Sequence, residues 1–312
     1  MYLEPGENNN NRTKNRVSLF RPNGSTGTAS AWQTWEAMPD ETMAYMVVIG
    51  GGGSGAGGFT GAAGAIRGGG GGGGAAGQTR GLIPLMFLPK KLYIQPGQGG
   101  AAVAASTAGN TGNLSYVSIG PNITAANIVM QSGAARASNT VATAGTIAAA
   151  GAGGTAETLS TVILCMQGQW GILQFLAGKV GAAGGAVTGA VGVANVLFTT
   201  GCSNGGAGGA STPAGNTEFA GGAQTGAGIY TTIVGGVSAG NPGHGSSGYD
   251  TQWEAIVPYG GAGGAAGGAA LSTAGDGGAG GFPGGGGGGG GGGVTGGRGG
   301  KGGDGCVIII SW

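Results

Sequence analysis

The chain has 312 residues, of which 84 are glycine; only 7% are charged, and the formal net charge at pH 7 is +1. This charge balance argues against a nucleic-acid-binding protein, which would carry a basic patch. The 40% apolar content also argues against classical disorder, which combines high charge with low hydrophobicity. Much of that apolar content is alanine, so backbone hydrogen bonding has to supplement apolar burial.

Residues 1–30 are polar and are expected to form an N-terminal arm rather than a core element. Two interpretations of this arm remain open, a surface tail and a strap that becomes ordered on a partner. The basic residues that are candidates for such an attachment are Arg12, Lys14, Arg16 and Arg21.

Residues 31–119 are interpreted as the first half of a glycine-rich β domain. The pattern over residues 31–49 predicts a strand, a turn at Pro39-Asp40 and a second, strong strand. Further strands are predicted within residues 91–95 and 114–119. Pro84 and Pro89 are expected to exclude a long helix or a central strand before Pro89.

Residues 120–258 form a middle excursion that is rich in alanine, glycine and threonine. The apolar spacing over residues 157–176 predicts a helix, and short strands are predicted at 195–198 and 229–234. Residues 259–312 return to glycine tracts and end in a strand. The two glycine-rich ends of the chain are therefore expected to meet in one sheet.

The glycine tracts predict an uncommon element. Residues 284–293 are ten consecutive glycines, and a second tract covers residues 68–74. A glycine run can adopt an extended helix with about 3 residues per turn and no internal hydrogen bonds. Bare backbones can then approach and hydrogen-bond one another. The predicted fold is mainly β with little helix, combining short antiparallel strands with packed polyglycine-II-type helices in a compact lattice.

Catalytic and cofactor motifs are weak. Residues 50–55 match the dinucleotide fingerprint, but neither the following helix nor the required acidic residue is present. His244 is the single histidine and has no catalytic partners in the sequence. Arg67 and Arg298, each followed by two glycines, are interpreted as solvated polar breaks between tracts. No enzymatic activity, cofactor or metal site is expected.

Aromatic residues on glycine-flanked loops are the best binding candidates, because aromatic rings can stack on sugars and on protein surfaces. The alternative is that each ring packs against the edge of the lattice. Residues 216–250 combine aromatics with Asn, Gln, Thr and His, and are the first candidate for a recognition tip. The candidate receptor-binding residues are Phe219, Tyr230, His244, Tyr249 and Trp253.

Several segments carry a family resemblance in both order and composition. They are Trp32-Gln-Thr-Trp35, Met46-Val-Val-Ile-Gly-Gly-Gly-Gly53, Leu82-Ile-Pro84, Leu88-Pro89, Leu92-Tyr-Ile-Gln-Pro-Gly97 and residues 299–312. Together they resemble the glycine-rich domain of bacteriophage tail-fibre and tail-associated proteins. The resemblance covers residues 32–119 and 259–312. It carries over no individual binding residue, because binding residues in that family lie on variable loops.

The resemblance implies a non-enzymatic virion protein, a tail-fibre or receptor-binding adhesin whose rigid scaffold presents loops to the host surface. The alternatives are a purely structural virion component, such as a head fibre, capsid decoration or tail-shaft protein, and a surface-glycan depolymerase. Asp250 and Glu254 are the only close pair of carboxylates in the predicted tip that could serve the last of these.

The expected partners are other tail or fibre proteins and a bacterial surface glycan or outer-membrane protein. Analogy with fibres suggests a homotrimer. Nucleic-acid binding and membrane insertion are not expected, and the protein is placed on the virion after assembly in the host cytoplasm.

Overall fold

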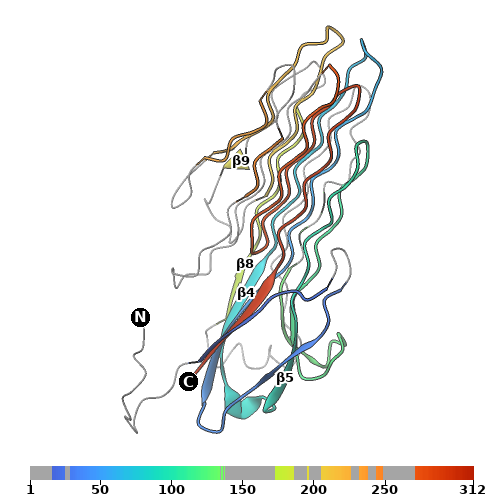
Figure 1. The fold of residues 1–312 in the computed structure, drawn as a ribbon. Coiled ribbons are helices and arrows are strands. Elements are labelled where there is room, and N and C mark those ends of the chain that lie inside the picture. Colours follow the sequence, from blue (N-terminus) through green and yellow to red (C-terminus); the bar gives the residue numbers. More distant parts are fainter. Residues whose placement is uncertain are drawn as a thin grey trace, which may run out of the picture.

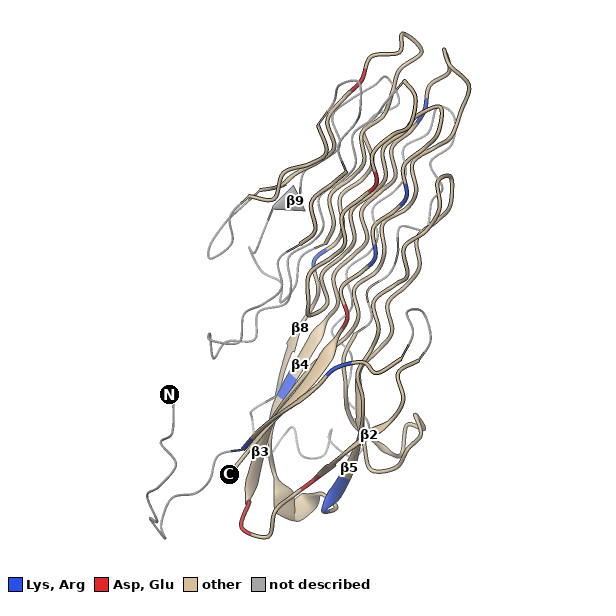
Figure 2. Cartoon of the chain, in the orientation of Figure 1, with Lys and Arg blue, Asp and Glu red and all other residues tan. Residues whose placement is uncertain are grey.

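The computed structural model describes residues 16–24, 29–133, 135, 137, 173–185, 195–196, 205–225, 232–237, 244–248 and 271–312. The molecule is elongated (Figure 1). The longer strands gather at one end, and zigzag tracts without regular secondary structure continue from them to the other end. Charged residues are sparse along these tracts (Figure 2).

The described part of the chain is mainly β, and its one helical element is a three-residue 3-10 turn. The elements in chain order are β1 (Arg16–Phe20), β2 (Gln33–Glu36), β3 (Met43–Ile49), β4 (Gln78–Pro84), η1 (Leu85–Phe87), β5 (Lys91–Gln95), β6 (Tyr116–Ser118), β7 (Ile128–Gln131), β8 (Leu173–Leu176), β9 (Asn195–Val196), β10 (Gln224–Thr225) and β11 (Cys306–Ser311).

Two antiparallel sheets dominate the strand end of the molecule. The first has the order β1-β11-β3-β4-β8, and the second has the order β2-β5-β6-β7. β9 and β10 form a separate short parallel pair. β11 pairs with β3 in register from Cys306↔Ile49 to Ser311↔Ala44. This pairing confirms the expectation that the two ends of the chain meet in one sheet.

A hydrophobic core lies between the two sheets. Alternate residues of β3, among them Met46 and Val48, join one buried cluster with Leu92 and Ile94 of β5. The other face of the first sheet carries a smaller cluster that includes Ile49 and Ala76. Because β3 is covered on both faces, it is a continuous apolar run rather than an alternating one.

Several predicted strands are confirmed. β2, a turn at Pro39-Asp40 and β3 follow the predicted order, although the two strands belong to different sheets. β5 and β6 lie within the ranges predicted from residues 91–95 and 114–119. Each of these segments combines β-branched or aromatic residues with flanking Gly, Pro or Ser, which is the local signal of a strand.

The helix predicted over residues 157–176 is wrong at its end. Residues 173–176 are β8, which pairs with β4 from Gly81↔Leu173 to Gln78↔Leu176; residues 157–172 lie outside the described part. Hydrogen bonding to an open strand edge outweighs the local apolar spacing, because strand pairing depends on tertiary context.

The expectation that the prolines exclude a central strand before Pro89 is also wrong, since β4 lies between β3 and β8. β8 pairs only with residues 78–81 of β4. Pro84, the last residue of β4, therefore has a strand partner on one side only, at Met43. A proline is tolerated there because no ladder hydrogen bond is needed on the open side.

Part of the predicted N-terminal arm is a strand. β1 pairs with β11 from Arg16↔Ser311 to Phe20↔Val307 and forms one edge of the first sheet. The Arg16 guanidinium donates hydrogen bonds to the Glu41 carboxylate at 3.1 Å and to the Glu36 carbonyl oxygen at 2.6 Å. Arg16 is therefore bound within the molecule rather than presented on a free arm.

Backbone hydrogen bonds join the glycine tracts with a period of three residues. The N–H groups of residues 50, 53, 56 and 59 donate to the carbonyl groups of 77, 74, 71 and 68. Residues 51, 54 and 57 donate to 113, 110 and 107, and residues 52, 55 and 58 donate to 303, 300 and 297. One tract thus bonds to three different neighbours in turn.

The tract over residues 285–293 follows the same rule. The N–H groups of residues 287, 290 and 293 donate to the carbonyl groups of 53, 56 and 59. Those of 288 and 291 donate to 278 and 275, and those of 289 and 292 donate to 207 and 210. These bonds place residues 207–210 against the long glycine tract. Backbone groups buried in this array are thereby satisfied without side chains.

Neighbouring tracts lie too close for side chains at most of the glycines. A Cβ built on Gly73 would lie 2.6 Å from the carbonyl carbon of Gly53, and one built on Gly287 would lie 2.7 Å from that of Gly300. Ordinary contact begins at 3.4 Å. Glycine is therefore required at these positions by the approach of another backbone, and the tracts cannot exchange it freely for alanine.

Candidate functional site

The tracts end in loops at the end of the molecule opposite the strands (Figure 1). The hydrogen-bond register brings these loops together: Gly293 donates to the Phe59 carbonyl group, and Arg67 and Thr212 exchange two backbone hydrogen bonds of 2.9 Å. We call this group of loops the tip, and it comprises residues 59–67, 103–107, 212–219, 271–274 and 293–297.

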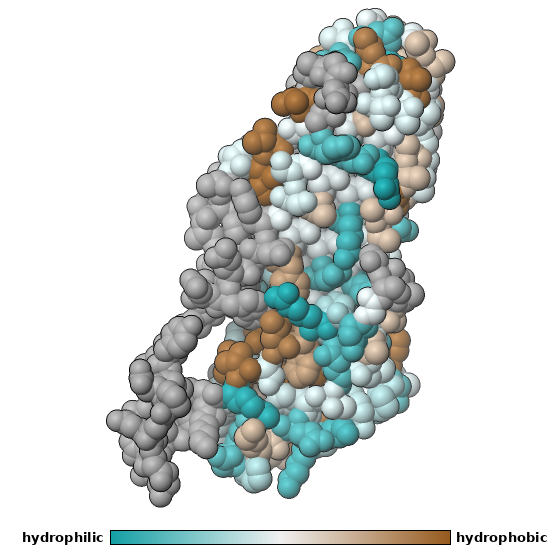
Figure 3. Space-filling model, in the orientation of Figure 1, coloured by the Kyte–Doolittle hydropathy of each residue, from teal (hydrophilic) through white to brown (hydrophobic). Residues whose placement is uncertain are grey.

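Side chains reappear at the tip after the glycine-rich array. Leu271 and Val294 are exposed apolar residues, and apolar side chains are visible at this end of the surface (Figure 3). Polar side chains tie the loops together. The Ser106 hydroxyl accepts from the Thr60 N–H at 2.9 Å, and the Glu218 carboxylate accepts from the Leu271 N–H at 3.0 Å. Loops held in this way on a rigid scaffold are typical binding positions.

Arg67 is the largest fully buried side chain among the described residues. Its Nη2 donates to Asn216 Oδ1 at 2.7 Å, whereas Nε and Nη1 have no hydrogen-bond partner. None of the ion pairs among the described residues includes it. Burial lowers the pKa of Arg67 from its usual value. The interpretation of Arg67 as a solvated polar break is therefore wrong, whereas Arg298 is exposed as expected.

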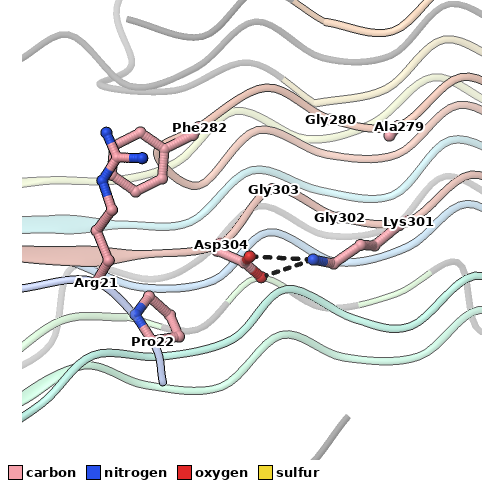
Figure 4. A pocket seen from close by; sticks show the side chains of 9 residues that line it. All are labelled: Arg21, Pro22, Ala279, Gly280, Phe282, Lys301, Gly302, Gly303 and Asp304. Carbon is pink, nitrogen blue, oxygen red and sulfur yellow. Dashed lines mark hydrogen bonds and ion pairs between the residues drawn. The ribbon is translucent and has the colours of Figure 1, made fainter. Parts of the chain in front are cut away.

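A second feature is a hollow of about 360 Å³ at the junction between the array and the sheets (Figure 4). The Arg21 guanidinium lies over the Phe282 ring, 4.3 Å from its centroid. Lys301 Nζ lies 3.0 Å from both carboxylate oxygens of Asp304, and the Gly99 N–H donates to Asp304 at 2.9 Å. Lys301 and Asp304 neutralise each other, so Arg21 gives this hollow its excess positive charge.

The Cys306 thiol is fully buried and belongs to the small core cluster against which Phe282 packs. Burial raises its pKa to about 12, and the positive charge of Arg21 opposes part of this rise. A thiol in this state is a poor nucleophile, because the reactive form is the thiolate. Cys306 therefore contributes to packing rather than to chemistry.

The sequence-predicted receptor-binding residues that can be placed do not share one loop. Phe219 is half-buried at the end of the 212–219 loop. His244 lies along the side of the array, where its Nδ1 accepts a hydrogen bond of 3.0 Å from the Asp276 N–H. Tyr230, Tyr249 and Trp253 lie outside the described residues, as do Arg12, Lys14, Asp250 and Glu254.

The described side chains of the tip are apolar and hydrogen-bonding groups, which can contribute to the binding of a ligand. The described residues contain no group of three or more His, Cys, Asp or Glu side chains that could hold a metal ion. In the same ranges no helix is long and apolar enough to cross a membrane. The most unusual group at the tip is a buried guanidinium, which can donate to an anion but cannot act as a base at neutral pH.

Arg67 and Asn216 were not selected by the sequence analysis. They are 149 positions apart, and an arginine followed by glycines has no local signal that distinguishes burial from exposure. The sequence matches no protein-family model, and no curated protein is significantly similar to it.

Proposed function

We propose that this chain is a non-enzymatic bacteriophage virion protein, a tail-fibre or receptor-binding adhesin that presents loops to the host surface on a rigid glycine-rich scaffold. The proposal rests on the resemblance of residues 32–119 and 259–312 to the glycine-rich domain of tail-fibre proteins. The observation that carries it furthest is the placement of the tip. A long array with few side chains separates these loops from the strand end.

The tracts are proposed to be polyglycine-II-type helices packed in a lattice. Support comes from the three-residue period of the hydrogen bonds, in which residues 50–59 donate to three different neighbours in rotation. An extended helix with about 3 residues per turn directs successive N–H groups in three directions. Such an array would be stiff, because each tract is held along its length by several others.

The strand end is proposed to dock onto other virion proteins, with the N-terminal residues contributing to that attachment. Met86 is 82% exposed and Phe87 is 50% exposed on the loop between β4 and β5. These apolar side chains also support the alternative of a purely structural virion component, in which cohesion with neighbours is the main role. A homotrimer, host-surface ligands and assembly in the host cytoplasm are part of the same proposal.

The experiment that tests the proposal is binding of labelled, folded protein to a panel of candidate host cells. Two matched pairs of exposed substitutions separate the two ends: Leu271→Ser with Val294→Ser at the tip, and Met86→Ser with Phe87→Ser at the strand end. All four side chains are exposed and none belongs to the two hydrophobic core clusters, so both variants are expected to fold. An adhesin predicts saturable binding that the tip pair weakens at least about tenfold and the strand-end pair leaves unchanged.

Two results would count against the adhesin. The first is an absence of saturable binding to every strain tested by protein of native melting temperature. The second is binding that is lost only in the strand-end pair. The second result would favour a structural component that docks through Met86 and Phe87.

A further inference from the structure

Arg67 is a positive charge enclosed at the tip, and no described residue forms an ion pair with it. Its side chain has no exposed surface, and a single hydrogen bond to Asn216 satisfies one of its five N–H donors. Nε and Nη1 lie unpartnered in the interior. The guanidinium remains protonated at neutral pH even when burial opposes its charge.

This state is energetically unfavourable for a purely structural residue. Buried charges in proteins are normally paired or coordinate a metal ion, and an apolar side chain of similar size is often as stabilising or more so. Packing alone would therefore be served better by methionine at this position. Arg21, in contrast, is exposed to solvent and lies over the Phe282 ring.

Two loops of the tip enclose Arg67, and little holds them together above it. Asn216 Oδ1 accepts both from Arg67 and, at 3.2 Å, from the Gly64 N–H. A Cβ added at Gly64 or at Gly215 would meet nothing within 4 Å, so the outer sides of both loops face open space. Moving Asn216 away from the 59–67 loop would break its hydrogen bonds with Gly64 and Arg67 and expose the guanidinium, while the two backbone hydrogen bonds between Arg67 and Thr212 would still join the two loops at their base.

Phe59 lies beside the same site. A Cβ built on Gly61 would lie 2.8 Å from the Phe59 ring and 3.1 Å from Arg67 Cγ, which places the aromatic ring and the arginine stem around one glycine. An aromatic ring beside a hydrogen-bond donor is a common way to hold a sugar, because the ring covers the apolar face of the pyranose.

We propose that Arg67 binds an anionic group, a carboxylate or a phosphate, carried by a glycan of the host surface and admitted between the 59–67 and 212–219 loops. The planar guanidinium matches both groups through charge-assisted hydrogen bonds. The source of the ligand rests on the proposed function, but the binding of the anion does not. The anion supplies the counter-charge that is absent among the described residues around Arg67.

The test measures the melting temperature of the full chain at low ionic strength with four sugars. Galacturonic acid is compared with galactose, and glucose 6-phosphate with glucose, so that each anion has a neutral match. The proposal predicts a saturable rise of about 3 °C or more for at least one anionic sugar and none for its neutral match. The anion that acts distinguishes an acidic sugar from a phosphorylated one.

Two variants make the result specific to Arg67. Arg67→Met is expected to melt at or above the wild-type temperature and to lose the response to the anion. Asn216→Asp keeps both acceptor contacts and adds the missing negative charge, and aspartate tolerates the φ of +55° found at this position. This variant is expected to melt higher than wild type and to bind the anion at least about tenfold more weakly.

The proposal is overturned if neither anionic sugar shifts the melting temperature well above millimolar concentration. It is also overturned if Arg67→Met responds as wild type does. Failure of the adhesin proposal would look different: the anion would still stabilise the purified protein while no host cell bound it. Cell binding that is unchanged in Arg67→Met, together with no anion effect, would retain the adhesin and exclude this site.

Discussion

Substitution of Gly289 by alanine tests whether the glycine tracts pack backbone against backbone. Gly289 lies in the run over residues 284–293 and donates a 2.9 Å hydrogen bond to the Ala207 carbonyl group. A Cβ at this position would lie 2.6 Å from the carbonyl carbon of Gly70 and 2.9 Å from the nitrogen of Gly209. Both obstacles are backbone atoms, so no side-chain rotation can relieve the clash.

The expected loss of stability follows from the backbone atoms that a Cβ at Gly289 would displace. Gly70 and Gly209 are themselves joined by a 2.7 Å hydrogen bond, and Gly70 donates another of 2.8 Å to Gly290. Overpacking strain costs about 1–3 kcal/mol, and each buried backbone group left without a partner costs about 1–3 kcal/mol. Alanine returns about 0.4–1 kcal/mol by restricting the unfolded chain. The expected net loss in the free energy of unfolding is about 3 kcal/mol.

Thermal melting followed by circular dichroism measures this loss. For a domain of this size we expect Gly289→Ala to lower the Tm by about 6–12 °C. Gly215→Ala is the matched control, because a Cβ there would meet nothing within 4 Å; its Tm should stay within about 2 °C of wild type. If both variants melted together near the wild-type temperature, close backbone packing of the tracts would be refuted.

Two further predictions concern the strand end. The raised pKa of Cys306, about 12 against a usual 9.0, means that above pH 9 the unfolded state loses this proton first. Between pH 9 and about pH 12, the wild-type free energy of unfolding should therefore fall by about 1.4 kcal/mol per pH unit relative to that of Cys306→Ala. Urea titrations at several pH values can measure this difference, and an equal dependence on pH in both proteins would contradict the burial of the thiol. Glu41→Ala should lower the stability by about 2–4 kcal/mol, because the carboxylate, 3% exposed, accepts from Arg16 and from the Ser311 hydroxyl at 2.6 Å. The exposed Glu36→Ala serves as its control, and a comparable loss there would show that the Glu41 contacts contribute little.

The strands at the core were predictable because their signals are local. The apolar run of β3 and the run of β11 both stand next to glycine tracts, and each alone indicates a buried strand. Their pairing was predictable as well, since the two glycine-rich ends of the chain each adjoin one of these strong strands. The turn at Pro39-Asp40 follows from residue types that favour turns irrespective of tertiary contacts.

The errors arose where a segment's state depends on a distant partner. Residues 173–176 have apolar spacing compatible with a helix, but the open edge of β4 offers them a hydrogen-bond ladder. Pro84 is admitted to an interior strand because β8 ends its pairing at Gly81. Neither the length of a neighbouring strand nor its edge can be read from the residues of the segment itself.

The sequence by itself determined a mainly β protein with glycine tracts, because strand propensity and the absence of side chains are properties of each residue. Only the tertiary structure decided which tracts lie together, and hence which side chains share the tip. Arg67 and Asn216 are 149 positions apart in the sequence and are brought together by folding. The burial of the Arg67 guanidinium without a counter-charge among the described residues results from this tertiary arrangement. The enclosure of a charge depends on neighbours brought together by folding, which is why an arginine followed by glycines carried no local sign of burial.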